Sequence, residues 1–78
     1  MEIKTKTYYI NLFDCYYQLL TKKQIKIFRY YFFEDFSYYE IAKIFSISHS
    51  AIYDIIKRIL KNLNKYEDKL KIYQNKEK

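Results

Sequence analysis

The 78-residue sequence contains no glycine and no proline, so its turns and helix ends must be formed by other residues. Helix N-caps are the signals that remain, because serine and threonine side chains accept hydrogen bonds from the free amides of a first helical turn. Thr21 and Gln24 match the S/T-x-x-E/Q capping box, in which each side chain caps the other residue's backbone amide. Ser37 and Glu40 form a second box, and Ser48 is a third candidate N-cap. These caps divide the chain into four or five helices.

Apolar residues recur with helical spacing between the caps, and no alternating strand pattern competes with them. We predict helices over about residues 8–20, 22–33 and 38–45, followed by a long helix that starts near His49. In the first two helices, the residues expected to face the core are Leu12, Phe13, Tyr16, Leu19, Leu20, Ile25, Phe28, Tyr31 and Phe32. The sequence therefore predicts an all-α protein.

The composition, with 50% hydrophobic and 31% charged residues, is typical of a globular protein. No apolar run approaches the roughly 20 residues that span a bilayer, so we expect no membrane insertion. The opening stretch "MEIKTKTYYINLFD" lacks the apolar segment and cleavage site of a secretory signal, and the single Cys15 cannot form an internal disulfide. We therefore predict a cytoplasmic location.

The residue patterns of common catalytic sites are missing. The sequence has one histidine, no glycine for a phosphate-binding loop and no Cys/His spacing of a metal site. Cys15 lies in the first predicted helix, where a small core residue is a more frequent role than a nucleophile. We predict no enzymatic activity, no cofactor and no metal.

The formal net charge of +6 at pH 7 is unevenly distributed. One acid-free basic cluster consists of Lys22, Lys23, Lys26 and Arg29, and another of Lys57, Arg58, Lys61 and Lys65. Two basic patches beside a more acidic middle are typical of a module that lies across a nucleic acid duplex. They could equally be two solvated helix faces, since an A/T-rich genome also favours lysine codons.

Residues 40–58, "EIAKIFSISHSAIYDIIKR", match a helix-turn-helix. Ala42 is the small residue required where the two helices cross, and Ser46 occupies a turn position that often adopts the left-handed conformation. The apolar positions expected to pack inward are Ile41, Phe45, Ile47, Ile52 and Ile55. The simpler alternative is an ordinary αα-hairpin with an alanine at its contact. We predict a four- to five-helix helix-turn-helix domain over residues 1–78, of the winged-helix-like DNA-binding type without the wing, with a C-terminal helical extension from about 59 to 75.

The exposed N-terminal residues of the second helix would face the bases of the major groove. They are Ser48, His49, Ser50, Tyr53, Asp54 and Lys57. Only Lys57 belongs to the Arg, Lys, Asn and Gln set that discriminates bases well, so we expect weak sequence readout. The complete set of candidate nucleic-acid-binding residues is Ser48, His49, Ser50, Tyr53, Asp54, Lys57, Arg58, Lys61, Lys22, Lys23 and Lys26.

Three stretches, "LFDCYYQLLTKKQ", "EDFSYYEIA" and "AIYDIIKR", resemble the YlxM family of small bacterial helix-turn-helix proteins over about residues 2–73. The central part is also similar to the fourth region of bacterial sigma factors. The YlxM resemblance implies a regulatory protein that acts with the signal recognition particle, with the particle's RNA and its GTPase as possible partners beside DNA. The alternative is a protein-interaction adaptor that keeps the scaffold and has lost sequence-specific DNA binding.

A heptad-like apolar series runs along the long C-terminal helix. Its members are Ile52, Ile56, Ile59, Leu63, Tyr66, Leu70 and Tyr73. The first two are needed by the helix-turn-helix core, so the remaining stripe must be covered by the first helix or by a second copy. Dimerisation, which we favour, would use Ile59, Leu63, Tyr66, Leu70 and Tyr73.

Overall fold

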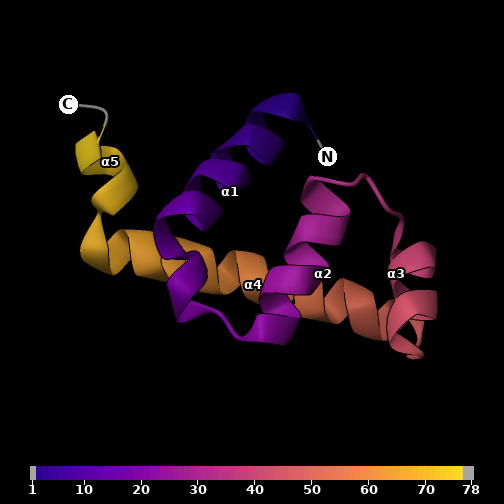
Figure 1. Cartoon of the computed structure of the whole chain (residues 1–78). Coiled ribbons are helices and arrows are strands. Elements are labelled where there is room, and N and C mark those ends of the chain that lie inside the picture. The colour runs from indigo at the N-terminus through magenta and orange to yellow at the C-terminus, as the bar shows by residue number, and fades with distance from the viewer. Residues whose placement is uncertain (1, 77–78) are drawn as a thin grey trace.

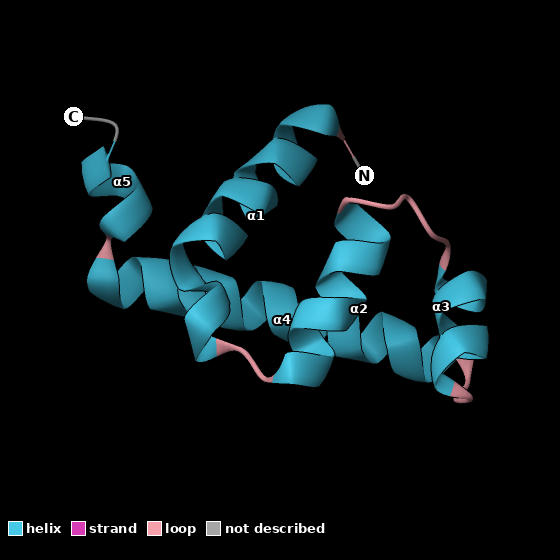
Figure 2. Cartoon of the chain, viewed as in Figure 1, coloured by secondary structure: helices cyan, strands magenta, loops and turns pink. Residues whose placement is uncertain are grey.

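A computed structural model describes residues 2–76, which are almost entirely helical and contain no strand (Figures 1 and 2). The elements in chain order are α1 (Ile3–Tyr16), a 3-10 turn η1 (Tyr17–Leu19), α2 (Lys22–Phe32), α3 (Tyr38–Phe45), α4 (His49–Leu70) and α5 (Ile72–Lys76). The prediction of an all-α protein is confirmed.

The three predicted helix starts are confirmed by their cap geometry. The Thr21 hydroxyl accepts from the Gln24 amide at 3.1 Å, and the Gln24 side chain accepts from the Thr21 amide at 3.0 Å. Ser37 and Glu40 repeat this exchange at 3.2 and 2.9 Å, and the backbone N–H of Ser37 lowers the pKa of the Glu40 carboxyl. The Ser48 hydroxyl accepts from the amide of the residue at N3 at 3.1 Å. Each N-cap stabilises its helix by about 1 kcal/mol. This matters in a chain that has no glycine or proline to end its helices.

Two helices differ in detail from the prediction. The first helix begins at Ile3 rather than at about residue 8, and it ends in the 3-10 turn η1. The C-terminal extension is helical as far as Lys76, but it is not one continuous helix, because Lys71 adopts the left-handed conformation with φ 53° and separates α4 from α5. A left-handed lysine is unfavourable by itself, so contacts beyond the helix must stabilise this break.

The contacts that hold the break come from α1 and from Glu67. The Tyr16 hydroxyl donates to the Glu67 carboxylate and accepts from the Ile72 amide at 3.0 Å. The same carboxylate accepts from the amides of Tyr73 and Gln74 at 3.2 and 3.0 Å. Burial, followed by the hydrogen bond to Glu67, raises the pKa of Tyr16. These bonds satisfy the first amides of α5 and turn it back toward α1.

Helix α4 is the central element, and α1, α2 and α3 all pack against it (Figure 1). The buried core consists of Leu12, Phe13, Tyr16, Leu20, Ile27, Phe28, Phe32, Ile41, Ala42, Ile52, Ile56, Ile59 and Leu63. Leu19 was wrongly expected in this core, because the 3-10 turn rotates it outward and leaves it 52% exposed. Ile25 and Tyr31 are only half-buried, while Ile27, which was not predicted, is fully buried on α2.

The first residues of the apolar stripe that was predicted to form a dimer are buried within the monomer. Ile59 and Leu63 are completely buried inside the monomer, beneath α1 and α2, and so cannot form a seam with a second copy. Leu70 is 51% exposed, and Tyr73 lies beyond the left-handed break on α5, so the stripe does not continue in register. Helices α1 and α2 of the same chain therefore cover this face.

Candidate nucleic-acid interface

The turn between α3 and α4 has the geometry of a helix-turn-helix. Ser46 is left-handed, with φ 56° and ψ 41°, and its amide donates to the carbonyl oxygens of Ala42 and Lys43. The Ile47 amide donates to the Ala42 carbonyl at 3.1 Å, which closes the C-terminus of α3. Ala42 is buried where α3 and α4 pack together, as expected for the small residue at the crossing. The left-handed turn at Ser46 is thus confirmed.

The inward-facing residues of the unit are buried to different degrees. Ile41 and Ile52 are fully buried, as predicted. Phe45, Ile47 and Ile55 pack against the core but remain half-buried. The unit therefore has a buried centre, formed by these isoleucines and Ala42, and a rim that is partly open to solvent.

The predicted base-facing residues are all exposed, on the N-terminal half of α4 or at its N-cap. They are Ser48, His49, Ser50, Tyr53, Asp54 and Lys57. Some of these side chains also make contacts within the protein. The Ser48 hydroxyl caps α4, and the His49 ring stacks on Tyr39 with centroids 4.2 Å apart. The ammonium of Lys57 lies 5.6 Å from the centroid of the Tyr53 ring. This end of the helix presents rings, hydroxyls, one carboxylate and one cation rather than amide or guanidinium groups.

Two tyrosines of α3 belong to this region and were not predicted. Tyr39 is 63% exposed, and Tyr38 packs edge-on against Tyr53 with centroids 5.4 Å apart. Tyr38 also stacks on Tyr31, and the two hydroxyls share a hydrogen bond of 3.3 Å. Burial and then the hydrogen bond with Tyr31 raise the pKa of Tyr38 to about 12. A signal for Tyr39 exists in the sequence, because it falls outside the apolar face that Ile41 and Phe45 define.

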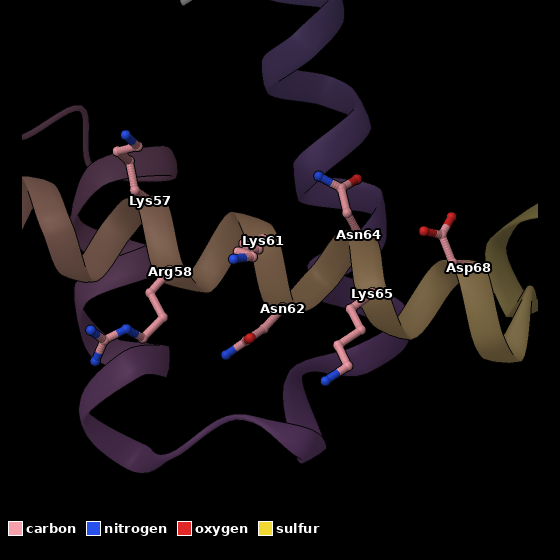
Figure 3. A pocket seen from close by; sticks show the side chains of 7 residues that line it. All are labelled: Lys57, Arg58, Lys61, Asn62, Asn64, Lys65 and Asp68. Atoms are coloured by element: carbon pink, nitrogen blue, oxygen red, sulfur yellow. The ribbon is translucent and has the colours of Figure 1, made fainter.

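The four cations of the α4 cluster line one open hollow of about 870 Å³ (Figure 3). We call this the basic hollow; its lining is Lys57, Arg58, Lys61, Asn62, Asn64, Lys65 and Asp68. The asparagines and Asp68 were not predicted. Asn64 is held in place, since its amide donates to the Tyr9 hydroxyl at 2.9 Å and accepts from Tyr8 at 3.3 Å. Four cations and one carboxylate make the hollow suited to an anion such as a phosphate backbone.

The second basic cluster lies apart from the basic hollow. Lys22, Lys23 and Lys26 are exposed on the first turns of α2, and none of them lines that hollow. The guanidinium of Arg29 instead lies 5.7 Å from the centroid of the Phe33 ring. The structure therefore places the cations of α4 around one hollow, whereas the three lysines of α2 are exposed and do not line it.

A second cavity of about 480 Å³ lies between α1 and α2. We call it the α1–α2 groove; its lining is Ile10, Asn11, Phe13, Asp14, Tyr17, Ile25, Arg29 and Phe33. Cys15 is half-buried and packs against the core, and burial raises the pKa of its thiol. Among residues 2–76, no group of three or more His, Cys, Asp or Glu side chains is placed to hold a metal ion. None of the helices in this range is long and apolar enough to cross a membrane.

The α3–α4 turn, its buried crossing and the exposed N-terminal half of α4 define a small helix-turn-helix protein. The chain belongs to the UPF0122 family, described as "Putative helix-turn-helix protein, YlxM / p13 like", which matches residues 3–78. The predicted resemblance to YlxM is thus confirmed.

Curated relatives agree with this assignment. The chain is 49% identical over 77 residues to a UPF0122 protein of Listeria monocytogenes, covering 94% of this chain and 70% of the relative. It is 44% identical over 75 residues to the UPF0122 protein YofM of Lactococcus lactis, covering 96% of this chain and 68% of the relative. No solved structure shows significant similarity to the chain. The family description names a helix-turn-helix protein and no enzyme class.

Proposed function

We propose that the protein is a non-enzymatic helix-turn-helix regulator that binds nucleic acid through α4. The observation that carries this proposal is the placement of Lys57, Arg58, Lys61 and Lys65 around one hollow on the helix that follows the turn. Phosphates neutralised by such side chains release counterions, which supplies most of the affinity of a sequence-independent contact. Lys22, Lys23 and Lys26 on α2 are secondary candidates for contacts with the same backbone.

Sequence readout is weak in this proposal. The Ser48 hydroxyl is used as the cap of α4, and the Asp54 carboxylate has the wrong charge for a phosphate and can accept only from base amino groups, such as that of cytosine. Ser50 contacts bases without strong preference. We therefore expect the ratio of specific to random duplex affinity to stay below the roughly thousandfold that marks true operators.

A salt-dependent binding measurement tests the proposal. About five phosphate contacts give a slope of log affinity on log salt near −4 to −5 for duplex DNA. Charge reversal of Lys57 and Arg58 together to Glu should abolish retention on DNA. The matched control is charge reversal of Lys4 and Lys69, two exposed lysines outside the basic hollow, and it should retain most binding. Unchanged retention of the Lys57 and Arg58 variant would refute the use of this face.

The finer role that we propose is cytoplasmic and linked to the signal recognition particle. It is supported by the YlxM-like family membership and by the resemblance in residues such as "EDFSYYEIA" and "AIYDIIKR". A pull-down for the particle's RNA and GTPase, run beside a genomic selection for DNA sites, tests it. Recovery of the particle's components supports the link, whereas tight selection of one DNA motif identifies a transcriptional regulator instead.

A second candidate function is that of a protein-interaction adaptor. The α1–α2 groove favours it, because its floor contains Phe13 and its rim carries the exposed rings of Tyr17 and Phe33. Such a groove could hold an apolar helix face of a partner. A variant with Phe33→Glu would then lose the partner and keep nucleic acid binding, whereas Lys57→Glu would do the reverse.

A further inference from the structure

Exposed aromatic rings gather on one side of the α3–α4 unit. Tyr39, in the first turn of α3, is 63% exposed, and its ring lies nearly parallel to that of His49, at 24° and 4.2 Å between centroids. Tyr53 follows one turn further along α4 and is 44% exposed. We call Tyr39, His49 and Tyr53 the aromatic face. It joins the N-terminal turns of both helices of the motif.

These rings do not suit the edges of paired bases. Edge recognition in the major groove uses bidentate amide and guanidinium groups, which the aromatic face lacks. Flat rings instead offer surfaces on which nucleobases stack, and this works for any base. The faces of bases inside a duplex are already covered by their neighbours. The ligand that fits the aromatic face is therefore one with unpaired bases.

The aromatic face is continuous with the basic hollow. Lys57 belongs to both, because its ammonium lies 5.6 Å from the centroid of the Tyr53 ring and its side chain lines the hollow (Figure 3). Along a helix axis, Lys57 is about 6 Å and Lys65 about 18 Å from Tyr53, at 1.5 Å per residue. A phosphate bound at Lys57 would thus leave its base within reach of Tyr53. Asp68 lies at the far end of the hollow, where its carboxylate would repel further phosphates.

We propose that the α3–α4 face binds single-stranded nucleic acid, with bases stacked on Tyr39 and Tyr53 and phosphates held by the basic hollow. This inference rests on the proposed nucleic acid binding and specifies its ligand as unpaired nucleotides. Positively charged grooves combined with aromatic platforms are the general means of binding single strands without sequence preference. The half-buried pair of Tyr31 and Tyr38 serves packing beneath this face and is not part of it.

Fluorescence anisotropy at one low salt concentration tests the proposal. The probes are a labelled single-stranded DNA of mixed sequence and the same strand annealed to its complement. Tyr39→Leu and Tyr53→Leu should each weaken single-strand binding about fivefold or more and change duplex binding less than about twofold. Tyr39→Phe and Tyr53→Phe keep the rings and should keep the affinity. Tyr17→Leu is the matched control, since Tyr17 is 41% exposed and lies outside this face.

The outcomes separate this inference from the proposed function. If the leucine variants bind both probes as the wild type does, or lose both equally, stacking is refuted and phosphate binding by α4 stands. A preference of the wild-type protein for duplex over single strand would also refute it. If the wild-type protein binds neither probe, both the inference and the proposed function are wrong. Circular dichroism on each variant, with the phenylalanine pair as reference, separates lost stacking from lost folding.

Discussion

The same substitution at two leucines of α4 should have very different consequences for stability. Leu63 is 0% exposed in the core, whereas Leu70, seven residues later in the apolar series, is 51% exposed. A buried Leu→Ala change removes transfer free energy and leaves a cavity, at a cost of about 3–5 kcal/mol. For a domain of this size each kcal/mol lowers the melting temperature by about 4–8 °C. Leu63→Ala should therefore lower it by at least about 10 °C.

Leu70→Ala should lower the free energy of unfolding by about 1 kcal/mol or less, because about half of the residue is already in water. Thermal unfolding, monitored by circular dichroism at several protein concentrations, measures the stability of both leucine variants. We expect the melting temperature of the wild-type protein not to depend on concentration. Equal effects at the two leucines would show that a second copy covers the apolar series and that our assignment of its cover to α1 and α2 is wrong. A loss of stability on Leu70→Ala that depends on protein concentration would show the same.

Three further perturbations follow from the geometry. The raised pKa of Tyr38, about 12, means that its contribution to stability is fully present below pH 10 and is lost as pH rises toward 12, so Tyr38→Phe should flatten the fall in melting temperature across that window. Ser46→Gly should raise the free energy of unfolding by about 0.5–1 kcal/mol by relieving its left-handed conformation, and a loss of stability by denaturant titration would contradict this. The raised pKa of the Cys15 thiol predicts alkylation near pH 8 that is slower than for an unstructured peptide thiol, and an equal rate would contradict its burial.

Helix starts could be predicted from the sequence because a cap is a local interaction. Thr21, Ser37 and Ser48 each act within three residues, so their hydrogen bonds depend only on the adjacent sequence. The basic hollow could also be predicted from the sequence, because helical spacing alone places Lys57 and Lys61 on neighbouring turns. These features require a helix and nothing more.

Features that depend on distant contacts were not predictable. The break at Lys71 is stabilised by Tyr16, which lies more than fifty residues away in the sequence. A heptad pattern within one helix cannot predict a break that depends on so distant a contact. The stack of Tyr39 on His49 joins two helices across the turn and appears only once their crossing is fixed. The first turns of α1 carry no cap bond from the Glu2 side chain, which explains why that helix was expected to start later.

The most direct test of the central claim is an NMR titration of the isotopically labelled protein with nucleic acid, in which changes in the backbone amide chemical shifts are measured. The account predicts that shifts concentrate on α3, the turn at Ser46 and α4 as far as Lys65, and that they shrink as salt is added. Amides around the α1–α2 groove should barely move. Shifts concentrated at Phe13, Arg29 and Phe33, or no shifts at low salt, would contradict the claim that the face formed by α3 and α4 binds nucleic acid.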